Sequence, residues 1–230
     1  MLKIELLHLS DSLFPVGSFA YSDGLETAAN WVRLKPDITY EVLREWIDVV
    51  LDENIGRLEG PALWRAWLAF VDRDWNALIA VDEEMTALRP AASARRSSRA
   101  MGLRLLTTWQ ALHPDPSLEH ALLLAARGAL GPSLPIAFAG ASASAAPAID
   151  RRDAVEAFAY TRLAATISAA MRLMPIGQTD AHALLARTLA RVPPVVDAIA
   201  ARDADPESFT PAMDLAAMSQ QYLHSRLFRS

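Results

Sequence analysis

Residues 13–26 read LFPVGSFAYSDGLE and combine residues that restrict the backbone with side chains that need burial. Pro15 fixes its own φ and disfavours a helical conformation at the residue before it, so a preceding helix should end there. Gly17 permits a turn that residues with side chains rarely adopt. This stretch, called the N-terminal corner below, therefore predicts a shaped turn after a first helix.

A second helix should follow this turn. Ser22 or Asp23 can accept hydrogen bonds from its free N–H groups, and Glu26 then falls in its first turn, where a negative charge is favourable. Gly24 adds a second position of unusual backbone freedom. A plain helix-turn-helix corner of a helical core would contain the same features, so the local pattern alone indicates no function.

The rest of the chain shows helical rather than strand periodicity, and no sequence period of 20–50 residues repeats. We expect Gly60 to end one helix and Pro61 to start the next. The sequence predicts an all-α fold, a single-domain bundle of about ten helices over residues 1–230. The clearest amphipathic helix carries its apolar face on Val42, Leu43, Trp46, Ile47, Val49 and Val50.

Composition excludes several classes of protein. The net charge of −5 and the absence of a Lys/Arg-rich block argue against a nucleic-acid partner. There is no cysteine, which excludes disulfides and thiolate chemistry and fits a reducing compartment. The most apolar stretch, residues 121–149, contains Arg127, three prolines and mostly small residues, so we expect no membrane span and a cytoplasmic location.

No residues in the sequence form a convincing catalytic or metal-binding motif. There is no Gly-x-x-x-x-Gly-Lys-Ser/Thr loop for nucleotide hydrolysis. His113 and His120 are separated by prolines that prevent one helix from aligning them, and Asp180 and His182 point to different helix faces. His8 lies near serines and an aspartate but lacks a nucleophile elbow. We predict no catalytic residue and no metal ligand, and no tightly bound cofactor.

The C-terminal tail, at about residues 219–230, carries the side chains typical of a binding surface. Apolar anchors rimmed by arginine are common at the centres of protein interfaces. The alternatives are a frayed terminus or a segment folded onto its own domain. The anchors are Tyr222, Leu223, Leu227 and Phe228, and the flanking charges are Arg226 and Arg229.

Three stretches, in order along the chain, resemble the urease accessory protein UreF family. The first is the corner, in Pro15-Val16-Gly17-Ser18-Phe19, Tyr21-Ser22 and Gly24-Leu25-Glu26. The second, Met174-Pro175-Ile176-Gly177-Gln178 followed by Asp180, is similar to the family's Pro-x-x-Gln segment. The third, Ser225-Arg226-Leu227-Phe228-Arg229-Ser230, resembles the family's C-terminus almost letter for letter.

The resemblance implies a helical, dimeric protein that assembles the urease nickel centre without being an enzyme. It implies a bridge between UreD (UreH in some organisms) and the GTPase UreG, with nickel passing through the complex to apo-urease. It further implies that UreD/UreH orders the tail, that Gly177 and Gln178 contact UreG or a second copy, and that the corner supports the active surface. The tail residues are Tyr222 and Ser225 to Ser230, and the corner residues are Pro15, Gly17, Ser22, Gly24 and Glu26.

One departure from the family pattern concerns the residues before the tail. Gln220-Gln221 stands where His-Glu is common, and His224 stands where Tyr is common. A metal-binding or base role of that pair therefore does not transfer, although Gln can still make hydrogen bonds. Two other functions remain open: a regulator of the UreG GTPase cycle that inserts an arginine, and an unrelated helical enzyme using His8 or His182.

Overall fold

The computed structural model describes residues 3–31 and 36–229, so Ser230 of the predicted tail lies outside the described residues. All regular structure in these ranges is helical, which confirms the all-α prediction. Because α3 and α4 are continuous, the number of separate helices agrees with the expected ten or so. The α-helices are α1 (Ile4–Leu9), α2 (Leu25–Trp31), α3 (Pro36–Val49), α4 (Gly60–Asp72), α5 (Trp75–Ala87), α6 (Ala92–Leu112), α7 (Pro116–Ala126), α8 (Leu134–Ala143), α9 (Arg151–Leu173), α10 (Gln178–Leu189), α11 (Val192–Arg202) and α12 (Pro211–Ser219), with 3₁₀ turns η1 (Ser18–Ala20) and η3 (Gln220–Tyr222).

The predicted break at Gly60 and Pro61 is wrong. A π-helical segment, η2 (Val50–Glu59), joins α3 to α4 without interruption. Its wider winding lets the Gly60 N–H bond back to the Ile55 carbonyl, so the helix continues through a proline that donates no bond.

The carbonyls that this winding frees find donors elsewhere in the chain. The Arg57 carbonyl, four residues before the proline, accepts from the Glu207 N–H at 2.9 Å. The Gly56 carbonyl accepts from the Arg202 guanidinium at 2.7 Å. Buried backbone groups are almost always paired, and these two bonds meet that requirement where the ordinary helical bonds are missing.

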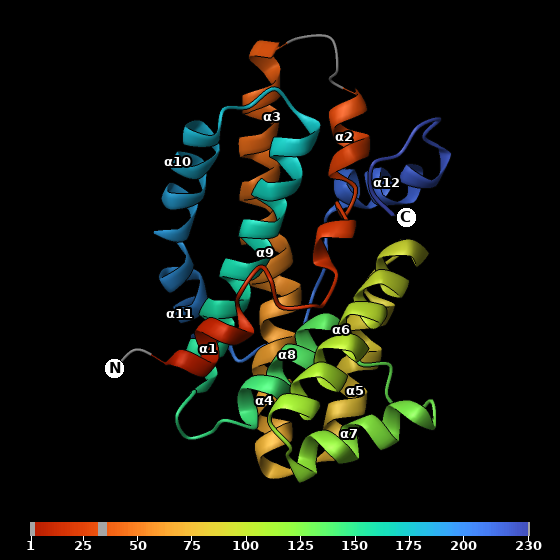
Figure 1. Ribbon diagram of the computed structural model, residues 1–230, viewed down its shortest axis with the longest axis vertical. Coiled ribbons are helices and arrows are strands. Elements are labelled where there is room, and N and C mark those ends of the chain that lie inside the picture. The colour runs from red at the N-terminus through yellow and green to blue at the C-terminus, as the bar shows by residue number, and fades with distance from the viewer. Residues whose placement is uncertain (1–2, 32–35, 230) are drawn as a thin grey trace.

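The helices pack around one cluster of buried apolar side chains. The long α3–η2–α4 helix runs along the molecule, with α9 beside it (Figure 1). Helix α8 is buried along almost its whole length and packs between α4 and α6, which its small residues allow. At the other end α12 lies against α2, so the C-terminal residues return to the N-terminal corner (Figure 1).

No helix in the described part of the chain is both long enough and apolar enough to cross a membrane.

Replacing Gly60 with alanine tests the packing of the π segment. An added Cβ would lie 2.4 Å from the Ile55 carbonyl oxygen and 2.6 Å from Ile199 Cδ1. Helix propensity alone predicts that Gly60→Ala stabilises the protein by about 1 kcal/mol. The clash predicts the opposite sign, a loss of about 2 kcal/mol in the free energy of unfolding measured with urea.

Gly177→Ala is the matched control, because its Cβ would meet nothing closer than an Asp180 carboxylate oxygen at 3.5 Å. Its effect should stay below about 1 kcal/mol. A Gly60→Ala protein as stable as the unmodified chain would contradict the proposed close approach.

Candidate functional site

The N-terminal corner has the predicted shape of a helix, a turn and a second helix. Helix α1 ends at Leu9, and Gly17 adopts φ +81°, the left-handed conformation that its lack of a side chain permits. The 3₁₀ turn η1 follows, and α2 starts at Leu25 with Glu26 in its first turn, as expected. The Glu26 N–H donates to the Ser22 hydroxyl at 3.4 Å, which agrees with a capping role for Ser22.

Gly24 allows α12 to pack directly against the corner. It has φ +93°, and an added Cβ would lie only 2.8 Å from the backbone nitrogen of Ala217 in α12. This close contact brings the end of α12 next to the start of α2. The Ser22 hydroxyl and the Gln220 side-chain oxygen are therefore 3.5 Å apart and hydrogen bonded.

Glu26 joins the corner to the C-terminal tail. Its side chain is almost completely buried, at 3% exposure, and its two carboxylate oxygens accept from backbone N–H groups of the tail. Leu227 N–H donates to one oxygen at 2.5 Å and Phe228 N–H to the other at 3.2 Å. The Gln220 amide donates a third bond at 3.3 Å. The sequence places Glu26 in the corner but gives no sign of these partners, because they lie about 200 residues further along the chain.

Phe228 is buried by the chain itself, at 4% exposure, which agrees with the alternative of a tail folded onto its own domain. The Arg172 guanidinium lies over its ring, 4.4 Å from the centroid, and also donates to the Phe19 carbonyl. The neighbouring Arg229 N–H donates to the Ala20 carbonyl at 2.8 Å. Within the chain itself, the Glu26 carboxylate and the Ala20 carbonyl thus bind the backbone of residues 227–229.

Other predicted tail residues point away from the corner. The Tyr222 side chain is 81% exposed and that of Leu227 is 54% exposed. Ser225 and Arg226 also lie on the surface. The tail therefore exposes one aromatic and one aliphatic side chain, and protein interfaces commonly bury groups of these kinds.

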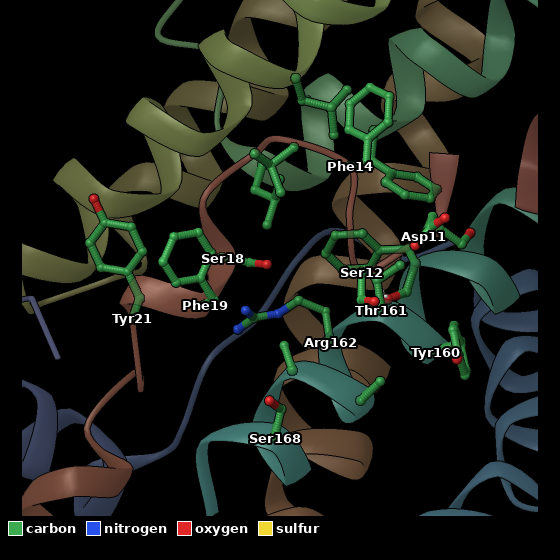
Figure 2. A pocket seen from close by; sticks show the side chains of 18 of the residues that line it. Asp11, Ser12, Phe14, Ser18, Phe19, Tyr21, Tyr160, Thr161, Arg162 and Ser168 are labelled. Atoms are coloured by element: carbon green, nitrogen blue, oxygen red, sulfur yellow. Dashed lines mark hydrogen bonds between the residues drawn. The ribbon is translucent and has the colours of Figure 1, made fainter. Parts of the chain in front are cut away.

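A cavity of about 150 Å³ lies between the corner and α9. Figure 2 shows the corner passing over α9, with Phe19 and Tyr21 on one side and Arg162 reaching up from the helix. Apolar side chains form much of its lining, among them Phe14, Phe158 and the buried Phe228. The corner and the tail thus share one apolar space beneath them.

A network of four charged side chains fixes the corner to the bundle. Glu59, 2% exposed in the π segment, pairs with Arg89 and with Arg162, and its contact to Arg162 Nε measures 3.1 Å. Arg162 then reaches Asp23 in the corner at 2.6 Å. A buried charge is costly unless it is paired with an opposite charge, so loss of one side chain of this network would leave its partner buried and unpaired. Nothing in the local sequence pattern marks these residues, because each comes from a different element.

The pKa directions in this network follow from its pairing. Burial alone would raise the pKa of Asp23, but the positive charges of Arg162 and Arg89 outweigh it and hold this pKa below its usual value. Burial alone would lower the pKa of Arg162, but Glu59 and Asp23 raise it. Asp23 and Arg162 are therefore both charged at neutral pH.

Gly177 and Gln178 lie apart from this site. Gly177 precedes α10, Gln178 begins it, and both are exposed. Figure 1 places α10 and α12 on opposite sides of α3 and α9. The structure therefore brings the corner and the tail together, but it does not bring the Pro-x-x-Gln segment to them. No group of three or more His, Asp or Glu side chains suited to a metal ion occurs among residues 3–31 and 36–229.

The fold and the site define an all-helical protein whose C-terminal tail is anchored to its N-terminal corner by a buried carboxylate. Comparison with known proteins then identifies the family. The UreF family model matches residues 39–189. Three relatives, each named urease accessory protein UreF, align over nearly the whole chain. They come from Azoarcus sp. strain BH72 (31% identity, 99% of this chain, 95% of the relative), Methylobacillus flagellatus (33%, 99%, 97%) and Rhodopseudomonas palustris strain BisB5 (34%, 94%, 86%). This chain belongs to the UreF family of urease accessory proteins, as its three motifs suggested.

Removal of the Glu26 carboxylate should release the tail. Glu26→Ala leaves three N–H groups without an acceptor, and each bond to a charged group contributes about 1.5–3 kcal/mol. We expect trypsin to cut after Arg226 at least about tenfold faster, since about 1.4 kcal/mol of local stability corresponds to tenfold in the open population. Glu41→Ala, which removes an exposed carboxylate on α3, is the control and should leave the rate unchanged. Equal cleavage of both variants would refute the anchoring role.

The charge network predicts a specific pH dependence for Asp23. Because its folded-state pKa is lowered, its ionised carboxylate stabilises the fold above its ordinary pKa, and this contribution is lost as the pH falls through the folded-state value. Asp23→Asn should cost about 1–3 kcal/mol at pH 7 by urea unfolding. The difference from the unmodified protein should shrink below pH of about 3.9. A difference that stayed constant from pH 7 to pH 3 would contradict the ionic role.

Proposed function

We propose that this protein is a non-catalytic component of the urease maturation machinery that bridges UreD/UreH and the GTPase UreG in the cytoplasm. By holding these partners together it promotes nickel insertion into apo-urease. Nickel passes through the assembled complex and is not a tightly bound cofactor of this chain. Membership of the UreF family supports this proposal, since the relatives carry the name urease accessory protein.

The observation that carries the proposal is the outward presentation of the tail. The buried Glu26 carboxylate fixes the backbone of Leu227 and Phe228, so their conformation is set before any partner arrives. A preorganised segment loses less conformational entropy on binding than a disordered one. We therefore propose that UreD/UreH contacts the exposed side chains of the tail, with Tyr222 and Leu227 as apolar anchors.

We also propose that the protein acts as a homodimer. Helix α1 and the residue stretch after it expose several large apolar side chains, with Ile4 at 62%, Leu7 at 53% and Leu13 at 86%. Exposed apolar side chains of this kind are commonly buried between subunits. UreG, or the second copy, would contact the exposed Gly177 and Gln178 at the start of α10.

Substitution of exposed tail side chains tests the partner surface without disturbing the fold. The double variant Tyr222→Ala, Leu227→Asp should lower the affinity for UreD/UreH by at least about tenfold, because two interface anchors of this type contribute more than 1 kcal/mol each. Surface plasmon resonance measures the affinity, and light scattering of the complex gives the number of copies.

Phe209→Ala is the matched control, since this aromatic side chain is 82% exposed but precedes α12 at the end opposite the tail. It should bind normally. Deletion of residues 226–230 is a less specific variant, because it also removes Phe228 from the core. Unchanged affinity of the double variant would overturn the proposed surface.

Measurement of UreG GTP hydrolysis with and without this protein separates a passive bridge from a regulator. A bridge leaves the hydrolysis rate of UreG unchanged, whereas an inserted arginine would accelerate it by several orders of magnitude.

A further inference from the structure

Two histidines that are distant in the sequence lie close together on the surface. His8 lies in the last turn of α1, and His113 directly follows α6. Their ring centroids are 6.2 Å apart, with the ring planes at 65°. Both residues are exposed, so water and ions reach the space between the rings.

A buried tryptophan forms a rigid wall beneath both rings. Trp109 is 1% exposed, and its indole N–H donates to the Ser144 hydroxyl at 3.1 Å. The His113 ring lies over it at 4.2 Å between centroids, and the His8 ring contacts it at 5.8 Å. Phe14 of the corner also contacts the His8 ring, at 5.4 Å between centroids. The two imidazoles are therefore positioned by packing before anything binds them.

The spacing of the rings suits a shared metal ion. A metal–imidazole bond of about 2.1 Å puts each ring centroid about 3.2 Å from the metal, so two histidines on one ion have centroids about 5–6 Å apart. The observed separation of 6.2 Å is close to the upper end of this range. Both histidines also lie at helix C-termini, where the helix dipole favours a positive charge.

We propose that His8 and His113 form a surface site for one divalent transition-metal ion of the class that imidazole prefers: Ni²⁺, Zn²⁺ or Cu²⁺. The two imidazole nitrogens supply the protein ligands, and water completes the coordination. No third protein ligand is grouped with them in the described part of the chain, so the site holds its ion in fast exchange rather than permanently. This site goes beyond the proposed bridging function and does not depend on it.

Isothermal titration of the untagged full-length protein with NiCl₂, and separately with ZnCl₂, tests the site. We expect one ion per chain. His8→Gln and His113→Gln should each weaken binding at least about tenfold, because a single remaining imidazole is a poor chelator. His120→Gln is the matched control: this exposed histidine also lies over a tryptophan, Trp75 at 4.5 Å, and it should leave binding unchanged.

An electron paramagnetic resonance spectrum of the unmodified protein with Cu²⁺ gives a readout that needs no variant. Two coordinated imidazoles predict hyperfine splitting from two nitrogens. Absence of binding by the unmodified chain, coupling to a single nitrogen, or binding that survives loss of either histidine would overturn the proposal.

Discussion

A buried carboxylate must be paired or hydrogen bonded, and Glu26 finds hydrogen-bond donors at the far end of the chain. A charge taken out of water costs several kcal/mol unless it is paired or hydrogen bonded. Its carboxylate accepts from the backbone N–H groups of Leu227 and Phe228 and from the Gln220 amide. The conformation of the tail follows from this requirement.

The rest of the architecture positions the donors. Gly24 lets the α12 backbone approach within contact distance, which brings Gln220 to Ser22 and Glu26. The Asp23–Arg162–Glu59 pairs fix the same corner to α9 and to the π segment. Ion pairs thus fix the corner to α9 and to the π segment, α12 packs against it, and the tail hydrogen bonds to it.

Local features of the fold were predictable from sequence, whereas the contacts between distant segments were not. The turn at Gly17 and the place of Glu26 in the first turn of α2 follow from residue types alone. The pairing of Glu26 with the tail spans about 200 residues, and no local pattern encodes it. The groups that cover Phe228, among them Arg172, are also distant in sequence, so no local pattern shows that the chain buries this ring.

The continuous helix through Pro61 shows a second limit. Proline usually follows a helix break because it cannot donate the ordinary α-helical hydrogen bond. Here the helix continues because a π segment changes the bonding pattern, and donors from other segments bond the Gly56 and Arg57 carbonyls. Gln220 is a further case: the sequence left it able to bond a partner, but in the structure it bonds Glu26 and Ser22. The candidate partner-binding surface is therefore limited to the exposed side chains of the tail, among them Tyr222 and Leu227.

The most direct test of this account is amide hydrogen exchange of the isolated protein, measured by NMR at Leu227 and Phe228. Anchoring by Glu26 predicts that both amides are protected without any partner, while the exposed Ser225 exchanges much faster. Exchange of Leu227 and Phe228 at the rate of a free peptide would contradict the account, because the tail would then be disordered until a partner binds.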